Sequence, residues 1–219
     1  MARVTGKAIR GAAGKVVYRT VNGQVIMSAK PSKYKKSKSR ALLSNRKKFL
    51  YAGGLAKIIK ECSILFAAWK QYSQDESTPH NSIMSNNIST ANNTGLTLSN
   101  TIVPPSDYSL IKDISLINNS INVSIELFGN YFAFVFEKQL RIFLLFTGLN
   151  STSNIEYESY SEIFIPAEGV TFQDIKIELT SKILDFINQH ENVILYSTAV
   201  WTTTSPFELC WSSSYAKKI

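Results

Sequence analysis

The first 60 residues of this 219-residue chain contain no aspartate and no glutamate. They carry 16 Lys and Arg, whereas the remaining residues carry 8 Lys and Arg against 16 Asp and Glu, so +16 at the front and −8 behind give the formal +8 of the chain. A charge split this strong indicates an anionic partner for the front segment. The candidate partners are nucleic acid, an acidic protein surface, a membrane surface and the chain's own acidic remainder.

Cysteine and histidine are scarce, with only Cys62, Cys210, His80 and His190. Their scattered positions do not have the ligand spacing of a metal site. Neither histidine has a motif-linked Ser, Cys or Asp that would make a nucleophile and base pair. We therefore expect two buried free thiols, no metal and no other cofactor.

Paired carboxylates are also sparse. Glu156 and Glu158 alternate along a Tyr- and Ser-rich stretch and would share one strand face. A solvated sheet face explains them better than acid–base chemistry. The sequence therefore predicts a protein that is not an enzyme and has no small-molecule substrate.

Long hydrophobic runs are missing as well. The most apolar stretch, from Tyr131 to Phe146, is interrupted by Glu137, Lys138 and Arg141, and it is too short and too charged to span a bilayer. The N-terminal residues are basic but lack the apolar core of a secretory signal. We expect a protein that stays in the cytoplasm or inside a particle assembled there.

The clearest local motif lies inside the basic front segment. Two β-branched runs, Val16 to Val21 and Gln24 to Met27, flank Asn22-Gly23. Asn-Gly favours a two-residue type I′ turn, because both turn residues need a positive φ. We predict a β-hairpin here, with a basic linker from Lys30 to Arg40 after it.

The basic segment also supplies the residues that we expect to contact a partner or its phosphates. One aromatic residue is among them, placed where it could stack on a base. They are Arg10, Lys15, Arg19, Lys33, Tyr34, Lys35, Lys36, Lys38, Arg40, Arg46, Lys47 and Lys48.

A helical pattern follows from about Ala41 to Tyr72. An apolar stripe of Leu42, Leu43, Phe49 and Leu50 is followed by Gly53-Gly54, which we expect to interrupt or bend the helix. A second stripe then recurs at intervals of three and four residues: Leu55, Ile58, Ile59, Cys62, Leu65, Phe66 and Trp69. Trp69 is predicted to anchor the core.

Residues 73–106 are rich in Asn, Ser and Thr, with a possible short helix from Asn81 to Ile88. Pro104-Pro105 closes this segment and predicts a domain boundary. We therefore divide the chain into a basic arm with a hairpin (1–40), a helical segment with a polar linker (41–106) and a β-domain (107–219).

Short strands with turn residues between them dominate the last part of the chain, around one short helix from Ser181 to Gln189. This pattern predicts a two-sheet sandwich or barrel, so that the fold class is mixed α+β and mainly β. The expected strands are Ser109–Leu116, Ile121–Phe128, Tyr131–Phe136, Gln139–Thr147, Tyr157–Ile165, Ile175–Leu179, Val193–Trp201 and Glu208–Tyr215.

The chain resembles an uncharacterised family of Bacteroidota proteins of similar length, over about residues 6–50 and more weakly over 108–219. The resemblance lies in a Gly-rich start, an N-G turn, an S-x-x-P-S segment, a basic helix ending in K-F and a late S-x-S-x-Y-like motif. The matching residues are Gly14-Lys15-Val16-Val17-Tyr18, Asn22-Gly23, Ser28-Ala29-Lys30-Pro31-Ser32, Lys48-Phe49 and Ser212-Ser213-Ser214-Tyr215. The resemblance implies an immunoglobulin-like β-sandwich in the second half and no established activity.

Two functions fit these features. The first is a structural assembly protein whose β-body contacts copies of itself or other subunits, while the basic arm docks on an acidic partner surface. The hairpin favours it, because a two-stranded ribbon is only marginally stable alone. The alternative is a DNA- or RNA-binding protein that contacts phosphates through the arm, in a salt-dependent and weakly sequence-specific way. An adhesion module is less favoured, since it rests on fold analogy alone.

Overall fold

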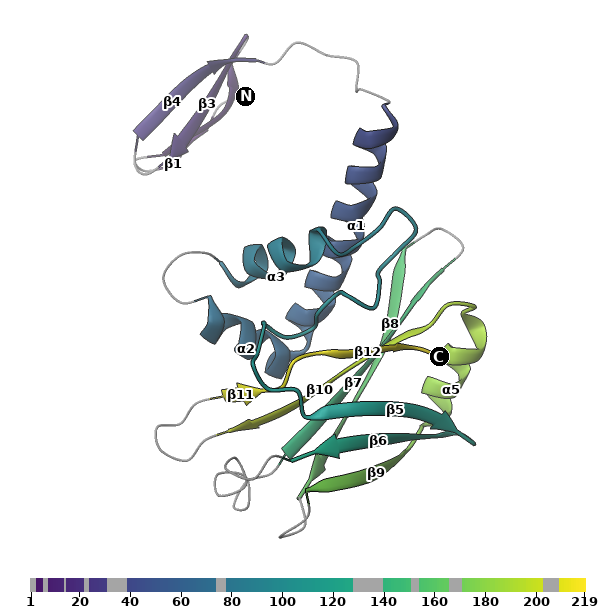
Figure 1. Cartoon of the computed structure of the whole chain (residues 1–219). Coiled ribbons are helices and arrows are strands. Elements are labelled where there is room, and N and C mark those ends of the chain that lie inside the picture. The colour runs from purple at the N-terminus through teal and green to yellow at the C-terminus, as the bar shows by residue number, and fades with distance from the viewer. Residues whose placement is uncertain are drawn as a thin grey trace. The chain divides into compact units, whose positions relative to one another are not determined.

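The computed structural model describes residues 3–5, 8–13, 15–21, 24–30, 39–73, 78–127, 140–150, 154–165, 171–202 and 209–219. The chain forms two compact units, Met1–Ser39 and Arg40–Ile219, which are described separately below. The secondary structure is mixed α+β and mostly β, with antiparallel pairing in its sheets (Figure 1). This agrees with the predicted fold class.

The first unit is one antiparallel sheet. Its strands are β1 (Arg3–Thr5), β2 (Ala8–Ala13), β3 (Val16–Val21) and β4 (Gln24–Ala29), in the order β1-β2-β3-β4. Val21 pairs with Gln24, so the predicted hairpin is confirmed in its pairing. The conformation of Asn22-Gly23 lies outside the described residues. The prediction missed β1 and β2, which extend the hairpin to four strands.

The second unit begins with three helices, α1 (Arg40–Glu61), α2 (Ser63–Tyr72) and α3 (Pro79–Ile88). The expected interruption at Gly53-Gly54 is wrong, because α1 continues through both glycines and ends at Glu61. The break comes at Cys62, whose φ of −89° and ψ of 96° are extended.

Packing explains the second of these glycines. A Cβ built on Gly54 would lie 3.0 Å from Ile155 Cδ1, so glycine lets α1 approach this side chain closely. The close contact offsets the roughly 1 kcal/mol that glycine costs inside a helix.

The helices enclose the predicted anchor Trp69. Its side chain is fully buried and its indole Nε1–H donates a hydrogen bond to the Ile102 carbonyl at 3.0 Å. The prediction of a core role for Trp69 is confirmed. The bond also ties α2 to the segment that leads into the first strand of the β-body.

The β-body consists of two further sheets. One has the order β5-β6-β9, and the other has the order β11-β10-β7-β8 with β12 also paired to β10. The bounds are β5 (Ile111–Ile117), β6 (Ser120–Glu126), β7 (Leu140–Leu149), β8 (Ile155–Phe164), β9 (Phe172–Glu178), β10 (Ile194–Thr202), β11 (Leu209–Trp211) and β12 (Tyr215–Lys218).

Most of the described strands agree with their predicted positions. The expected strand Tyr131–Phe136 lies outside the described residues. The single strand expected from Glu208 to Tyr215 is wrong, because the structure has two short strands there. Ser212 separates them, and its hydroxyl accepts a hydrogen bond from the Ala199 amide at 3.0 Å.

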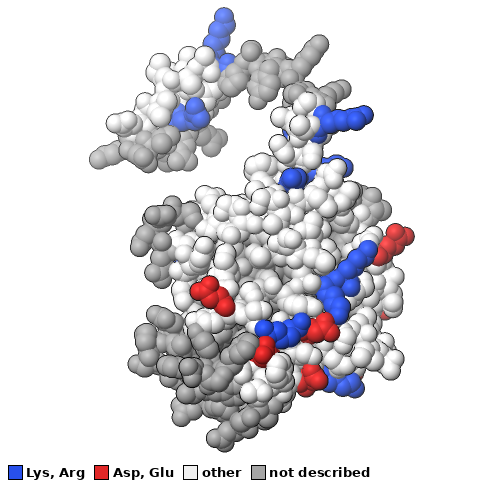
Figure 2. Space-filling model, viewed as in Figure 1, with Lys and Arg blue, Asp and Glu red and all other residues white. Residues whose placement is uncertain are grey.

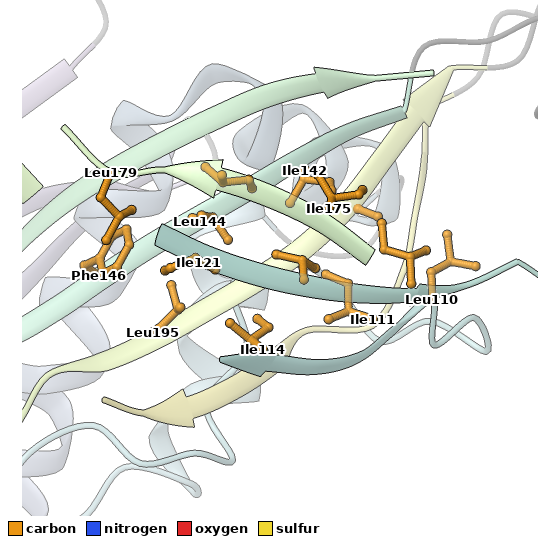
Figure 3. Close-up of a cluster of buried hydrophobic side chains, with 14 of the residues drawn as sticks. Leu110, Ile111, Ile114, Ile121, Ile142, Leu144, Phe146, Ile175, Leu179 and Leu195 are labelled. Atoms are coloured by element: carbon orange, nitrogen blue, oxygen red, sulfur yellow. The ribbon is translucent and has the colours of Figure 1, made fainter. Parts of the chain in front are cut away.

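The sheet that contains β7 is buried on both faces. Leu144 and Phe146 of β7 belong to a core shared with the β5-β6-β9 sheet, which Figure 3 shows in close-up. Phe143 and Leu145, one residue out of phase, belong to a second core with the helices. Because neighbouring strand residues point to opposite faces, the second unit has three layers of helices, large sheet and small sheet (Figure 1).

The last helix, α5 (Ser181–Gln189), connects β9 to β10 and matches the predicted bounds. Ile183 and Phe186 on one side of α5 are buried in the core between the two sheets. The helix therefore closes part of the sandwich.

Candidate interaction surface

The residues expected to contact a partner are divided among three places. Arg10 lies in β2, Lys15 between β2 and β3, and Arg19 in β3; the side chains of Lys15 and Arg19 are exposed. Lys33, Tyr34, Lys35, Lys36 and Lys38 lie outside the described residues. Arg40, Arg46, Lys47 and Lys48 all lie in the first three turns of α1.

These first turns of α1, residues 40–50, are here called the α1 head. None of its residues is buried, whereas Tyr51, Ala52, Leu55 and Ile59 in the rest of α1 are. The head therefore extends beyond the core of its own unit, as Figure 1 shows. At a rise of about 1.5 Å per residue its length is roughly 16 Å.

The head combines basic and apolar side chains on its exposed surface. Leu43, Phe49 and Leu50 are 45%, 58% and 56% exposed, and Arg46 and Lys47 between them are exposed as well. In the sequence these apolar residues had only indicated a helical stripe, and their role as a surface was missed. Their separation of six or seven residues was the available signal, since it places them on neighbouring lines of one helix side.

The positive charges of this surface have no internal counter-charge among the described residues. In the described parts of the chain, the first cation of α1 with an ion pair is Lys57, which pairs with Glu61 at 4.0 Å. In the β-body, by contrast, cations and carboxylates pair locally, as in Lys112–Glu126 and Lys217–Asp113, both at 2.8 Å. In Figure 2 the α1 head shows blue side chains without red ones beside them.

The four-stranded sheet of the first unit also exposes apolar side chains. Val25, Ile26 and Met27 of β4 are 44%, 42% and 64% exposed. Because consecutive strand residues point to opposite faces, β4 has apolar side chains exposed on both faces of the sheet of its own unit. A sheet gains stability by burying a face against another element, so this unit has apolar surface available for a partner.

A second candidate site lies where β7, β8 and α5 meet. His190 Nε2 is 3.2 Å from Glu156 Oε2, and His190 Nδ1 is 2.8 Å from the Phe186 carbonyl. Glu156 also accepts a hydrogen bond from the Asn150 amide at 2.7 Å. Sequence analysis had found no partner for His190, because residues 34 positions apart meet only in the folded sheet.

This cluster lacks the arrangement that catalysis needs. The His190 side chain is only 5% exposed and both its ring nitrogens lie within hydrogen-bond distance of oxygens of its own chain, so the ring is shielded from a substrate. Glu158, the neighbouring carboxylate, is paired with Lys182 at 2.8 Å. A cavity of about 640 Å³ lies next to the cluster, lined mainly by polar and small side chains with Lys218 at its rim. The contacts fit a structural latch between β8 and α5.

Two other polar contacts shape the edges of the unit. The Tyr157 hydroxyl donates a hydrogen bond to the Glu61 carboxylate, which joins β8 to the end of α1 and raises the pKa of Tyr157 to about 12. Asp113 of β5 accepts hydrogen bonds from the Lys217 ammonium and the Tyr215 hydroxyl, and the Lys217 contact lowers the pKa of this carboxyl. The two bonds of Asp113 link β5 of the small sheet to β12 of the large sheet.

Neither Cys62 nor Cys210 is in a disulfide, and both side chains are half-buried. Burial, followed by the nearby charge of Glu61, raises the pKa of Cys62, which favours the protonated thiol over the thiolate. Among the described residues no group of three His, Cys, Asp or Glu side chains is placed to hold a metal ion.

No protein-family model, curated protein or solved structure matches this chain. The resemblance to the Bacteroidota family therefore stays a prediction. In the described parts of the chain, no helix is both long and apolar enough to cross a membrane.

Proposed function

We propose that this chain is a non-enzymatic assembly protein whose basic N-terminal part docks on an acidic surface of a partner subunit. The observation that carries the proposal is the α1 head, where Leu43, Phe49 and Leu50 are exposed beside cations that have no ion pair among the described residues. Exposed apolar residues among Arg and Lys are typical of protein interfaces, whose centres are enriched in aromatic residues and Arg.

The charge of the first unit supports the same proposal. Residues 1–39 hold 10 Lys and Arg and no carboxylate, so the unit carries a formal +10, while residues 40–219 hold 14 Lys and Arg and 16 Asp and Glu, a formal −2. With a formal −2, residues 40–219 of a second copy offer little net negative charge to the basic part. A different, acidic protein is therefore a better partner than a second copy of this chain.

We also propose that the β-body is an immunoglobulin-like sandwich, as the family resemblance implies. Its support is the strand order: among the described strands of the body, the first, second and fifth form one sheet, and the third, fourth, sixth, seventh and eighth form the other. Immunoglobulin-type sandwiches distribute their strands in closely similar ways, except that in the constant type the fourth strand joins the first sheet. Such folds serve many unrelated functions, so the fold supplies a scaffold and the interaction surface carries the functional argument.

Nucleic-acid binding is the second candidate. It is favoured by the absence of carboxylates from the first 60 residues, which is typical of segments that contact phosphates. It gives no reason for the exposed Leu43, Leu50 and Met27, because phosphate contacts use cations and polar groups. This difference makes the assembly function the better supported of the two.

The first test is to purify the full chain natively at low and high salt and analyse it by size-exclusion chromatography with light scattering and a 260/280 nm ratio. We expect a species larger than the 24.5 kDa monomer with the absorbance ratio of protein. Replacing Arg40, Arg46 and Lys47 by Ser should release the partner. The matched control replaces Lys60, Lys70 and Lys218, which are equally exposed cations outside the head, and should keep it.

A monomer at every concentration and salt, with no partner protein isolated alongside it, would contradict the assembly function. A high absorbance ratio that falls to the protein value as salt rises would instead support nucleic acid as the partner, because phosphate contacts weaken steeply with salt.

A further inference from the structure

One cation of the α1 head is surrounded by apolar side chains. Arg46 lies three residues after Leu43, three before Phe49 and four before Leu50. Residues three and four apart are neighbours on a helix surface. These four residues, here called the Arg46 patch, therefore form one surface with the guanidinium near its centre.

The centre of the patch faces away from the core of its own unit. Leu55 is fully buried in the core between the helices and the large sheet. Arg46 precedes it by nine residues, or about two and a half helical turns, which places the two on opposite sides of α1. Phe49 forms the edge of the patch nearest the core, because it lies seven residues before the buried Ala56.

The centre of the patch restricts what can cover it. A partner that covers the three apolar side chains also removes Arg46 from water, and a buried unpaired guanidinium is strongly unfavourable. The partner must therefore place an anionic group opposite Arg46 and apolar groups around it. Arginine suits this role because its planar fork can bind a carboxylate through two hydrogen bonds.

Three other occupants fit less well. The first unit carries a formal +10 and would be repelled by the cations of the head. A lipid surface could bury Leu43 and Leu50 only if Arg46 also moved below the headgroups, because Arg46 lies between the two leucines. Burying that charge in the bilayer is unfavourable. Nucleic acid would satisfy the cation and leave the apolar side chains in water.

We infer that the Arg46 patch binds an acidic amphipathic helix of a partner protein. A carboxylate of that helix pairs with Arg46, and apolar side chains on either side of it cover Leu43, Phe49 and Leu50. The inference rests on the proposed assembly function and specifies the chemistry of its partner. Helix-on-helix docking fits the geometry, because Leu43 and Leu50 are seven residues apart and apolar residues with that spacing face a partner helix.

The test uses the full chain and a designed, dye-labelled helical peptide with leucines seven residues apart and a central glutamate between them. Binding is measured by fluorescence anisotropy. We expect Arg46→Glu to weaken binding by about tenfold or more. Lys60→Glu makes the same charge change at an exposed position of α1 outside the patch, and it should weaken binding by less than about threefold. A peptide with Lys in place of its central Glu should bind the Arg46→Glu variant better than it binds the wild type.

Several outcomes would overturn the inference. One is an equal loss of peptide affinity in Arg46→Glu and Lys60→Glu. Another is equal binding of a scrambled peptide of the same composition. A third is displacement of the peptide by phosphatidylserine vesicles or a DNA duplex at comparable charge concentration. Circular dichroism spectra of both variants identify any loss of helix. Leu50→Ser provides a second variant with no charge change, and it should also weaken binding.

This test can fail while the proposed function stands. If native, protein-only complexes depend on the α1 head and the peptide still does not bind, the partner is not an acidic helix and only this inference fails. If the native chain is always a monomer, the proposed function fails whatever the peptide does.

Discussion

The ring of His190 lies directly against the backbone of Gly148. A Cβ built on Gly148 would be 2.6 Å from His190 Cδ2 and 2.7 Å from Cγ, closer than real Cβ atoms come to their neighbours. The latch formed by His190, Glu156 and the Phe186 carbonyl thus depends on the absence of a side chain at position 148.

Gly148→Ala should therefore destabilise the protein. The added methyl group must displace the buried imidazole, and overpacking of this kind costs about 1–3 kcal/mol of unfolding free energy. Urea denaturation followed by tryptophan fluorescence measures the loss. Gly53→Ala is the control, because its Cβ would meet only Met84 Sδ at 4.0 Å; alanine in this helix interior should stabilise by about 0.5–1 kcal/mol. Similar effects at both positions would show that His190 does not restrict Gly148.

Substitutions at Trp69 and Phe49 should differ in their effect on the unfolding free energy, because only Trp69 is part of the core. Trp69→Ala removes a fully buried indole and its hydrogen bond to Ile102, which we expect to cost about 3–5 kcal/mol. Phe49 is 58% exposed on the α1 head, and Phe49→Ala should change the unfolding free energy by less than about 0.5 kcal/mol. The same denaturation experiment measures both. A large loss for Phe49→Ala would mean that this ring is buried in solution, which would contradict its place in the Arg46 patch.

The sequence predicted most strands of the body because their local patterns are strong. Turn residues at Asn118-Asn119 were among the signals, and both have positive φ, 46° and 66°. The sequence did not show which layer covers each face of a sheet. In β7, Phe143 and Phe146 are both buried aromatic residues, yet one contacts the helices and the other the small sheet. Periodicity gives the alternation of side chains and leaves open which layer covers each face.

The candidate surface was predictable in its charge and only partly in its geometry. The run of cations is visible in the sequence, whereas the exposure of Leu43 and Leu50 depends on where the core of α1 begins. That start, at Tyr51, is set by contacts with residues far along the chain. The prediction of a helix interruption at Gly53-Gly54 was wrong for the same reason. The contact of Gly54 with Ile155 joins residues about a hundred positions apart, and the local sequence does not reveal it.

The serine-rich end of the chain should be important for folding. The Ser212 side chain is fully buried and its hydroxyl accepts a hydrogen bond from the Ala199 amide at 3.0 Å. Ser212→Ala leaves this amide without its partner, and an unsatisfied buried donor costs about 1–3 kcal/mol. Ser213→Ala is the neighbouring control: Ser213 is half-buried and its backbone amide, which the substitution keeps, donates to the Tyr108 carbonyl at 2.5 Å. Thermal unfolding measures the loss of stability in each of the two variants. An equal loss for both would show that the Ser212 bond is not the cause.

The contact between Tyr157 and Glu61 predicts a dependence on alkaline pH. The hydrogen bond to the carboxylate stabilises the neutral phenol, and burial and the negative charge of Glu61 add to the effect, so the pKa of Tyr157 rises from its ordinary 10.0 to about 12. Because the folded state has the higher pKa, the contact stabilises the fold fully below pH 10, and this contribution is lost as the pH rises towards 12. The ultraviolet absorbance of wild type minus Tyr157→Phe, followed against pH, isolates this phenol among the ten tyrosines. Glu61→Gln should move its titration to lower pH, because the amide carries no negative charge. An unchanged titration in Glu61→Gln would mean that the carboxylate does not set this pKa, and that β8 and α1 are joined there by packing alone.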